Sequence, residues 1–167
     1  MKTFCTTTII VAFLLLGANV AQAQTTQTKL DQMELMKQFL GIWKGELTKD
    51  TVMIMNFTSY GKALEDNLKI FTKGKILSSA KEIYGYNPKY DKIVVAAIGD
   101  DSPQIAIYAA WFSSKDTGNL VGYQYLANPE KSNFKVQWIL IPPDSAKRIV
   151  YQNSKVISVS TYIREKQ

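Results

Sequence analysis

Regularly spaced turn signals divide the chain after Gly41 into a succession of short apolar segments. The segments are rich in residues typical of strands, and Gly, Pro, Asn or Asp stand between neighbouring segments. All five prolines fall in these connections, as an uninterrupted antiparallel meander requires. The pattern predicts up to ten strands, over residues 42–48, 51–59, 63–71, 76–86, 92–99, 104–112, 120–126, 134–141, 146–152 and 156–164.

One helical pattern precedes the strands. Met33, Met36 and Leu40 recur at helical spacing within residues 29–40, and Asp31 suits the first turn of a helix. No later stretch shows a helical pattern long enough to cross between parallel strands, which argues against a parallel α/β sheet. We therefore predict an all-β fold, an up-and-down antiparallel β-barrel of about eight to ten strands with one short N-terminal helix.

The first residues have the pattern of a secretory signal peptide. Lys2 gives a positive start, an apolar run follows, and Ala21-Gln22-Ala23 is a small-x-small cleavage site. The apolar run is short for a bilayer span, and no stop-transfer segment follows it. We predict a signal peptide over residues 1–23, a barrel domain over residues 24–167, export to the periplasm or the extracellular space, and no stable membrane span after cleavage.

Composition excludes several kinds of chemistry. Cys5 is the only cysteine and would leave with the signal peptide, and the chain has no histidine. Disulfides and nucleophiles of the Ser-His or Cys-His type are therefore excluded, and a metal site would need oxygen ligands alone. We predict no metal and no cofactor, and we assign no catalytic residue.

The charge of the chain gives little indication of a macromolecular partner. The formal net charge is +6, but the basic residues are mostly scattered lysines, and Arg148 and Arg164 are the only arginines. A nucleic-acid surface is typically a basic stripe with interleaved aromatic residues and more arginine. We predict no nucleic-acid partner, and the sequence leaves the oligomeric state open.

Two short motifs resemble the lipocalin-like (calycin) barrels. The first predicted strand opens with Leu40-Gly41-Ile42-Trp43-Lys44-Gly45, and a Gly85-Tyr86-Asn87-Pro88-Lys89 turn lies near the middle of the chain. Small exported bacterial proteins with a lipocalin-like domain and no assigned activity share both features. The resemblance covers about residues 30–165.

The resemblance implies a barrel in which Trp43 plugs the closed end, with Gly41 giving room beside it and Arg164 packing over the indole. These three residues are the structural candidates. The chain departs from the family in lacking the usual disulfide. Fatty-acid-binding relatives hold a carboxylate with Arg-x-Tyr on the last strand, but the order here is Tyr162-Ile163-Arg164, so that site does not carry over. Haem-binding relatives use a histidine, which is absent.

Aromatic residues on the central strands are the candidates for a ligand pocket, because Tyr hydroxyls inside a barrel suit an amphipathic molecule. Ordinary core packing is the alternative for each of them. The predicted ligand-binding residues are Tyr84, Tyr108, Trp111, Tyr123, Phe134 and Trp138.

Alternation indicates which faces of some strands point inward. One predicted internal set is Phe134, Val136, Trp138 and Leu140. A second is Val121, Tyr123 and Tyr125. In the last strand, Ile157, Val159 and Ile163 look more internal than the face of Ser160, Tyr162 and Arg164.

Asp66 alternates with Leu64, Leu68 and Ile70, so it is predicted to point into the barrel. A buried carboxylate needs a partner and is a candidate functional group. The alternatives are a position at a strand end or edge, or a different register.

Three functions remain open. The first is an exported binding protein that holds a small apolar or amphipathic molecule inside the barrel. The second is a cyclase- or isomerase-like enzyme of the calycin type that uses an internal Asp or Tyr. The third is an interaction module with a filled core. An internal void of about 300 Å³ or more would favour binding, and the lack of such a void would favour the filled core. An internal carboxylate beside a Tyr and a cavity would favour the enzyme.

Overall fold

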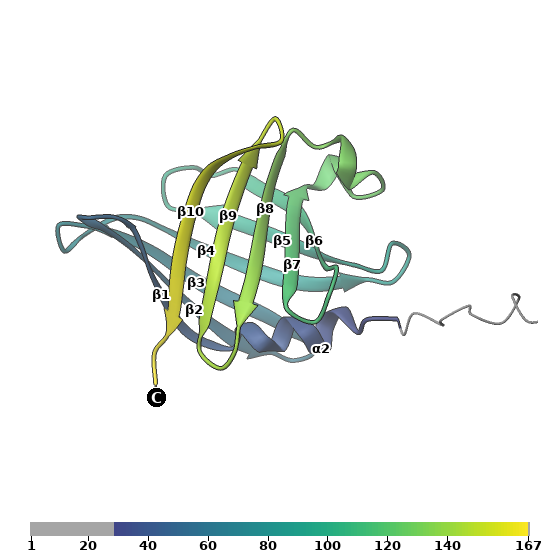
Figure 1. Cartoon of the computed structure of the whole chain (residues 1–167), viewed down its shortest axis with the longest axis horizontal. Helices are drawn as coiled ribbons and strands as arrows, with labels where there is room; N and C mark the ends of the chain where they lie inside the picture. Colours follow the sequence, from purple (N-terminus) through teal and green to yellow (C-terminus); the bar gives the residue numbers. More distant parts are fainter. Residues whose placement is uncertain (1–28, 167) are drawn as a thin grey trace, which may run out of the picture.

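The computed structural model describes residues 29–166 as one closed β-barrel (Figure 1). The predicted signal peptide lies outside these residues. The short helix α2 (Gln32–Met36) continues into the 3₁₀ turn η2 (Lys37–Phe39). The strands are β1 (Gly41–Thr48), β2 (Thr51–Tyr60), β3 (Ala63–Thr72), β4 (Lys75–Asn87), β5 (Lys92–Gly99), β6 (Ile105–Phe112), β7 (Thr117–Gly122), β8 (Phe134–Ile141), β9 (Ser145–Gln152) and β10 (Lys155–Arg164).

Every strand pairs antiparallel with its neighbour in sequence, and β10 returns to pair with β1. The predicted fold class is therefore confirmed. The closing pair is short: it joins Trp43 to Arg164, Lys44 to Ile163 and Gly45 to Tyr162. Closure removes the open edges that a meander would otherwise expose at its first and last strands.

The helical segment is shorter than the predicted range 29–40 and lies across one end of the barrel (Figure 1). Asp31 caps it by accepting a hydrogen bond from the Glu34 amide at 3.0 Å, as short polar side chains do at helix N-termini. Met36 and Phe39 turn inward and join the main core. This end of the barrel is thereby closed.

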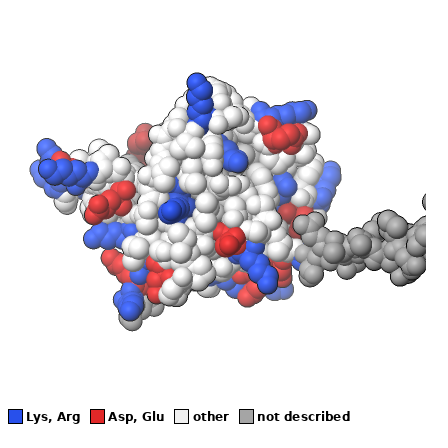
Figure 2. All heavy atoms as spheres, viewed as in Figure 1, with Lys and Arg blue, Asp and Glu red and all other residues white. Residues whose placement is uncertain are grey.

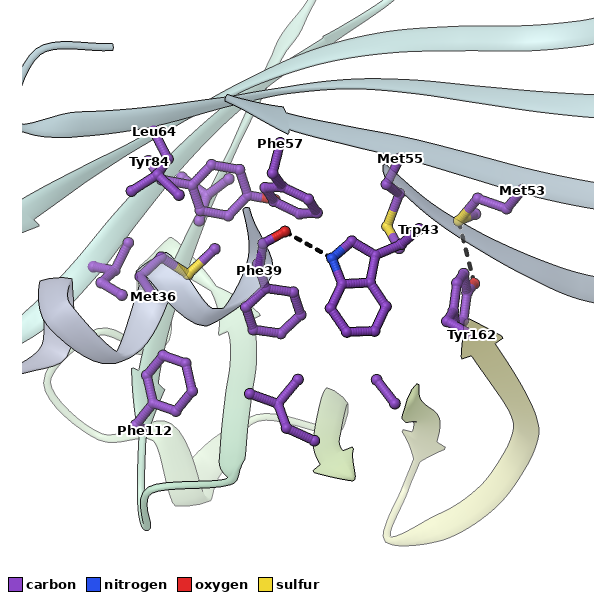
Figure 3. Packing of buried hydrophobic residues seen from close by; sticks show 14 residues of the cluster. Met36, Phe39, Trp43, Met53, Met55, Phe57, Leu64, Tyr84, Phe112 and Tyr162 are labelled. Carbon is purple, nitrogen blue, oxygen red and sulfur yellow. Dashed lines mark hydrogen bonds between the residues drawn. The ribbon is translucent and has the colours of Figure 1, made fainter. Parts of the chain in front are cut away.

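Trp43 is the centre of the closed end. Its side chain is 1% exposed, and its indole Nε1 donates a 2.7 Å hydrogen bond to the Phe39 carbonyl (Figure 3). A buried indole N–H needs such a partner, and η2 supplies it. The helical segment and the first strand are therefore joined through one side chain.

Arg164 lies over the indole, as the resemblance implied. Its guanidinium carbon is 4.6 Å from the centroid of the Trp43 ring, and its Nη2 donates to the Gln38 carbonyl at 2.6 Å. Gly41 has φ +108°, a conformation that L side chains rarely adopt, and a Cβ there would lie 3.6 Å from Arg164 Cδ. The backbone conformation therefore requires glycine, whereas a Cβ there would make only ordinary van der Waals contact with the arginine stem.

The predicted faces of β10 are wrong. Tyr162 and Ser160 point into the barrel and are 0% and 4% exposed, whereas Ile163 and Val159 lie outside at 54% and 59% exposed. The Tyr162 ring occupies the space above Gly45, where a Cβ would come within 2.5 Å of it. Its hydroxyl lies 3.3 Å from the Met53 sulfur (Figure 3). This fit turns the face of β10 that carries Tyr162 inward and leaves the face with Val159 and Ile163 in contact with water.

The seventh predicted strand, 120–126, is also wrong in its second half. Strand β7 ends at Gly122, and the chain enters the 3₁₀ turn η3 (Tyr123–Tyr125), at the opposite end of the barrel from α2 (Figure 1). Val121 is buried against Ala109 and Leu126 in a cluster separate from the main core. The predicted internal set of Val121, Tyr123 and Tyr125 is therefore wrong, because Val121 and Tyr125 belong to this separate cluster and Tyr123 is 40% exposed in η3.

Acidic and basic side chains are interspersed on the face of the barrel shown in Figure 2. Within residues 29–166, no helix is long and apolar enough to cross a membrane.

Candidate functional site

A cavity of about 200 Å³ lies inside the barrel, next to the residues that plug the closed end. Its volume does not reach the expected void of about 300 Å³, at which pockets for drug-sized ligands begin. The volume is larger than that of an apolar cavity of about 150 Å³ that is known to hold benzene. Its wall is mostly apolar and includes Met36, Phe39, Met53, Met55, Phe57, Leu68, Ile93, Tyr108, Ala110, Phe112, Leu120, Phe134, Val136 and Trp138.

Strands β3 and β4 bring acidic groups into the barrel. Asp66 and Glu82 are paired residues on these neighbouring strands, and both alternate with inward-facing residues. Tyr84, two residues after Glu82 on the same face, donates a hydrogen bond from its hydroxyl to Glu82 Oε2. Glu82 and Tyr84 line the cavity, and Asp66 lies beside them with 0% of its surface exposed.

Asp66 is confirmed as an inward-facing residue, and it lacks the partner that a buried carboxylate needs. Neither carboxylate oxygen accepts a hydrogen bond from any residue that the structure describes. Burial, together with the negative charge of Glu82, raises the pKa of Asp66 from 3.8 to about 7. The nearby backbone amides of Asn56 and Asn67 offset part of this rise. Asp66 therefore changes protonation near neutral pH.

Burial also raises the pKa of Glu82, while the Tyr84 hydroxyl and the positive charge of Arg148 oppose the rise. The pKa of Tyr84 lies well above its ordinary value because the ring is buried and the charges of Glu82 and Asp66 disfavour a phenolate. Tyr84 therefore holds its proton and shares it with the carboxylate.

Arg148 enters the barrel from β9. It pairs with Trp138 on β8 and Ser160 on β10, and it alternates with the buried Ala146 and Val150. Its side chain lines the cavity. Among residues 29–166, it makes no side-chain hydrogen bond and no ion pair. The cavity therefore has a cation with free donors in a wall that is otherwise mostly apolar.

The structure brings most of the predicted ligand-binding residues to the cavity. Tyr84, Tyr108, Phe134 and Trp138 line it. Phe134 is 38% exposed at the start of β8, and Trp138 packs edge-on against Phe39 at 5.6 Å between ring centroids. The predicted internal face of β8 is therefore correct.

The two remaining aromatic candidates lie differently. Trp111 contributes to the cavity wall, but its ring lies 4.8 Å from the Lys92 ammonium and packs against the outer cluster of Ala109, Val121 and Leu126. Tyr123 lies in η3, is 40% exposed and does not line the cavity.

Sequence reasoning missed Arg148 and Glu82. A signal for both was present, because Arg148 stands between Ala146 and Val150 at a spacing of two, and Glu82 stands two residues before Tyr84. A charged residue in an alternating apolar set is as compatible with an exposed face as with an internal one. The register of the closed barrel decides between the two.

Within residues 29–166, no group of three or more acidic, His or Cys side chains is arranged to hold a metal ion. No protein-family model matches the sequence, and the search of curated proteins gave no match. The ten-strand antiparallel barrel is consistent with a calycin-like fold. Arguments about function therefore rest on the cavity and the groups that line it.

Proposed function

We propose that this chain is an exported binding protein that holds one small apolar or amphipathic molecule inside its barrel. The observation that carries the proposal is the cavity of about 200 Å³, with its mostly apolar wall and a few polar groups, among them Glu82 and Tyr84 from β4 and Arg148 from β9. Ligand sites commonly combine a mainly apolar lining with a few placed polar groups. The volume limits the enclosed part of the ligand to little more than a benzene-sized group.

Calorimetric titration with toluene tests this proposal. We expect saturable binding with a stoichiometry near one per chain. Ala110 lines the cavity, so Ala110→Leu should fill part of it and weaken binding. Ala96, on the neighbouring strand β5, alternates with the buried Val95 and lies on the outer face. Ala96→Leu is the matched control and should leave binding unchanged.

Absence of toluene binding would favour the interaction module with a filled core. Equal weakening by the two substitutions would also contradict a ligand in the cavity. Native mass spectrometry of protein purified from its own host adds an independent readout, because a co-purified ligand appears as added mass. The same spectrum tests export, since removal of residues 1–23 leaves a mature chain that begins at Gln24.

A proton-transfer enzyme is the second candidate, favoured by the hydrogen bond between Tyr84 and Glu82 at the cavity wall. A carboxylate with a raised pKa and a tyrosine hydroxyl could exchange a proton with a bound carbonyl compound. The test is incorporation of deuterium beside the carbonyl of small ketones in D₂O. We expect Tyr84→Phe to abolish any protein-dependent incorporation. Incorporation no faster than in buffer would exclude this activity for the ketones tested.

A further inference from the structure

We propose that Arg148 receives the carboxylate of the bound molecule, so that the ligand is a small acid with an apolar body. The inference rests on the proposed binding function and specifies its ligand class. It concerns strand β9, and is separate from the Arg-x-Tyr arrangement of the last strand that fatty-acid-binding relatives use.

The position of Arg148 is fixed by its neighbours. Trp138 and Ser160, the residues paired with it on either side, both face the interior. Ala146 and Val150 on its own strand are 0% and 6% exposed. Arg148 is thereby placed on the inner face of the barrel, where the residue is partly buried.

Among residues 29–166, Arg148 has no side-chain hydrogen bond and no ion pair. Glu82 is close enough for the two charges to influence each other, but it forms no ion pair with Arg148 and instead accepts the hydrogen bond from Tyr84. A charge that is partly withdrawn from water and has no partner in the protein can gain from a ligand that supplies one. Because Arg148 lines the cavity, a ligand bound there can approach its donors.

The chemistry of the guanidinium selects that partner. Its planar fork of N–H donors fits the two oxygens of a carboxylate and forms paired, charge-assisted hydrogen bonds. Tyr84 already directs its hydroxyl proton to Glu82, so Arg148 is the charged donor in the cavity wall. The rest of the wall, including Phe39 and Trp138, is mostly apolar, with Asn119 and Tyr108 as further polar residues. An aromatic or short aliphatic carboxylate therefore matches both the volume and the groups.

Three probes of nearly the same shape isolate the charge: benzoate, benzamide and benzamidinium. Calorimetric titrations of the unmodified protein should show benzoate binding about tenfold to hundredfold more tightly than benzamide, the effect expected for hydrogen bonds to a charged group. Benzamidinium should bind most weakly, because its cation would face the guanidinium.

Arg148→Met keeps the length of the stem and removes the charge. We expect it to reduce the affinity for benzoate by about tenfold or more and to leave that for benzamide nearly unchanged. Lys147→Met is the matched control, since Lys147 is the preceding residue and lies exposed on the outer face. Arg148→Lys keeps the charge without the fork, and we expect an intermediate affinity for benzoate.

Several outcomes would overturn the inference, and they separate it from the proposed function. Benzamide binding as tightly as benzoate would refute carboxylate recognition and leave small-molecule binding intact. If benzamidinium bound most tightly, the site would be assigned to a cation held by acidic groups such as Glu82 in the cavity wall. Equal loss in the Arg148 and Lys147 variants would remove the role of Arg148. Failure of toluene and of all three probes to bind would refute both proposals. The charge series on the unmodified protein remains decisive if Arg148→Met fails to fold.

Discussion

Replacing Asp66 with asparagine should make the protein more stable above neutral pH. Asp66 is 0% exposed and has no hydrogen-bond partner among the described residues, and burial raises its pKa to about 7. In the unfolded chain, the carboxyl ionises near its ordinary pKa of 3.8. Between these two values, the folded state holds a proton that the unfolded state has released. The free energy of unfolding must therefore fall as pH rises through this window.

The size of the effect follows from the two pKa values. A rise from 3.8 to about 7 corresponds to about 4 kcal/mol over the whole window. About 2 to 3 kcal/mol of this is lost between pH 5 and pH 8. The side-chain amide of asparagine does not titrate, so Asp66→Asn should remove this part of the pH dependence. The stability of the variant relative to the natural protein should increase by the same amount between the two pH values.

Urea denaturation of both proteins at pH 5 and pH 8 measures the difference directly. Glu65→Gln is the matched control, because Glu65 is the preceding residue and its pKa is lowered by the hydrogen bond with Lys81. A lowered pKa affects stability below this range, so the control should keep the slope of the natural protein. Parallel pH profiles for the natural protein and Asp66→Asn would refute the reasoning. They would mean that the Asp66 carboxylate is solvated or paired in the folded state.

Two further predictions concern the closed end. Trp43→Ala should cost about 3 to 5 kcal/mol of stability, and Arg164→Ala should cost less. In denaturant melts, the double variant should lose about 0.5 to 2 kcal/mol less stability than the sum of the two single variants, because the two side chains are in contact. Strict additivity would contradict that contact. Gly45→Ala should destabilise by about 1 to 3 kcal/mol because its Cβ would meet the Tyr162 ring at 2.5 Å. At Gly118 the nearest atom would be 3.7 Å away, so Gly118→Ala should be much milder in the same melts; equal costs would show that the Tyr162 ring moves aside.

The candidate site was only partly predictable from the sequence. The inward orientation of Asp66 and of one face of β8 was predicted correctly. In both cases apolar residues alternate along the strand, which is a local signal. Arg148 and Glu82 were missed, although both stand in similar alternating sets. Alternation says which residues share a face, and it does not say whether a face that contains a charge turns inward. That depends on partners from strands far away in the sequence.

The sequence by itself determined the short helix and an antiparallel meander of up to ten strands, because turn residues and strand length are set by neighbouring residues. The second half of the seventh predicted strand is the exception. Closure of the barrel decided which faces of the later strands turn inward. The pairing of β1 with β10 places Tyr162 over Gly45, and this fit turns Val159 and Ile163 outward against their hydrophobicity. It also leaves Arg148 and Glu82 at one cavity from strands β9 and β4. Packing between distant strands determines these positions, and no local pattern in the chain records it.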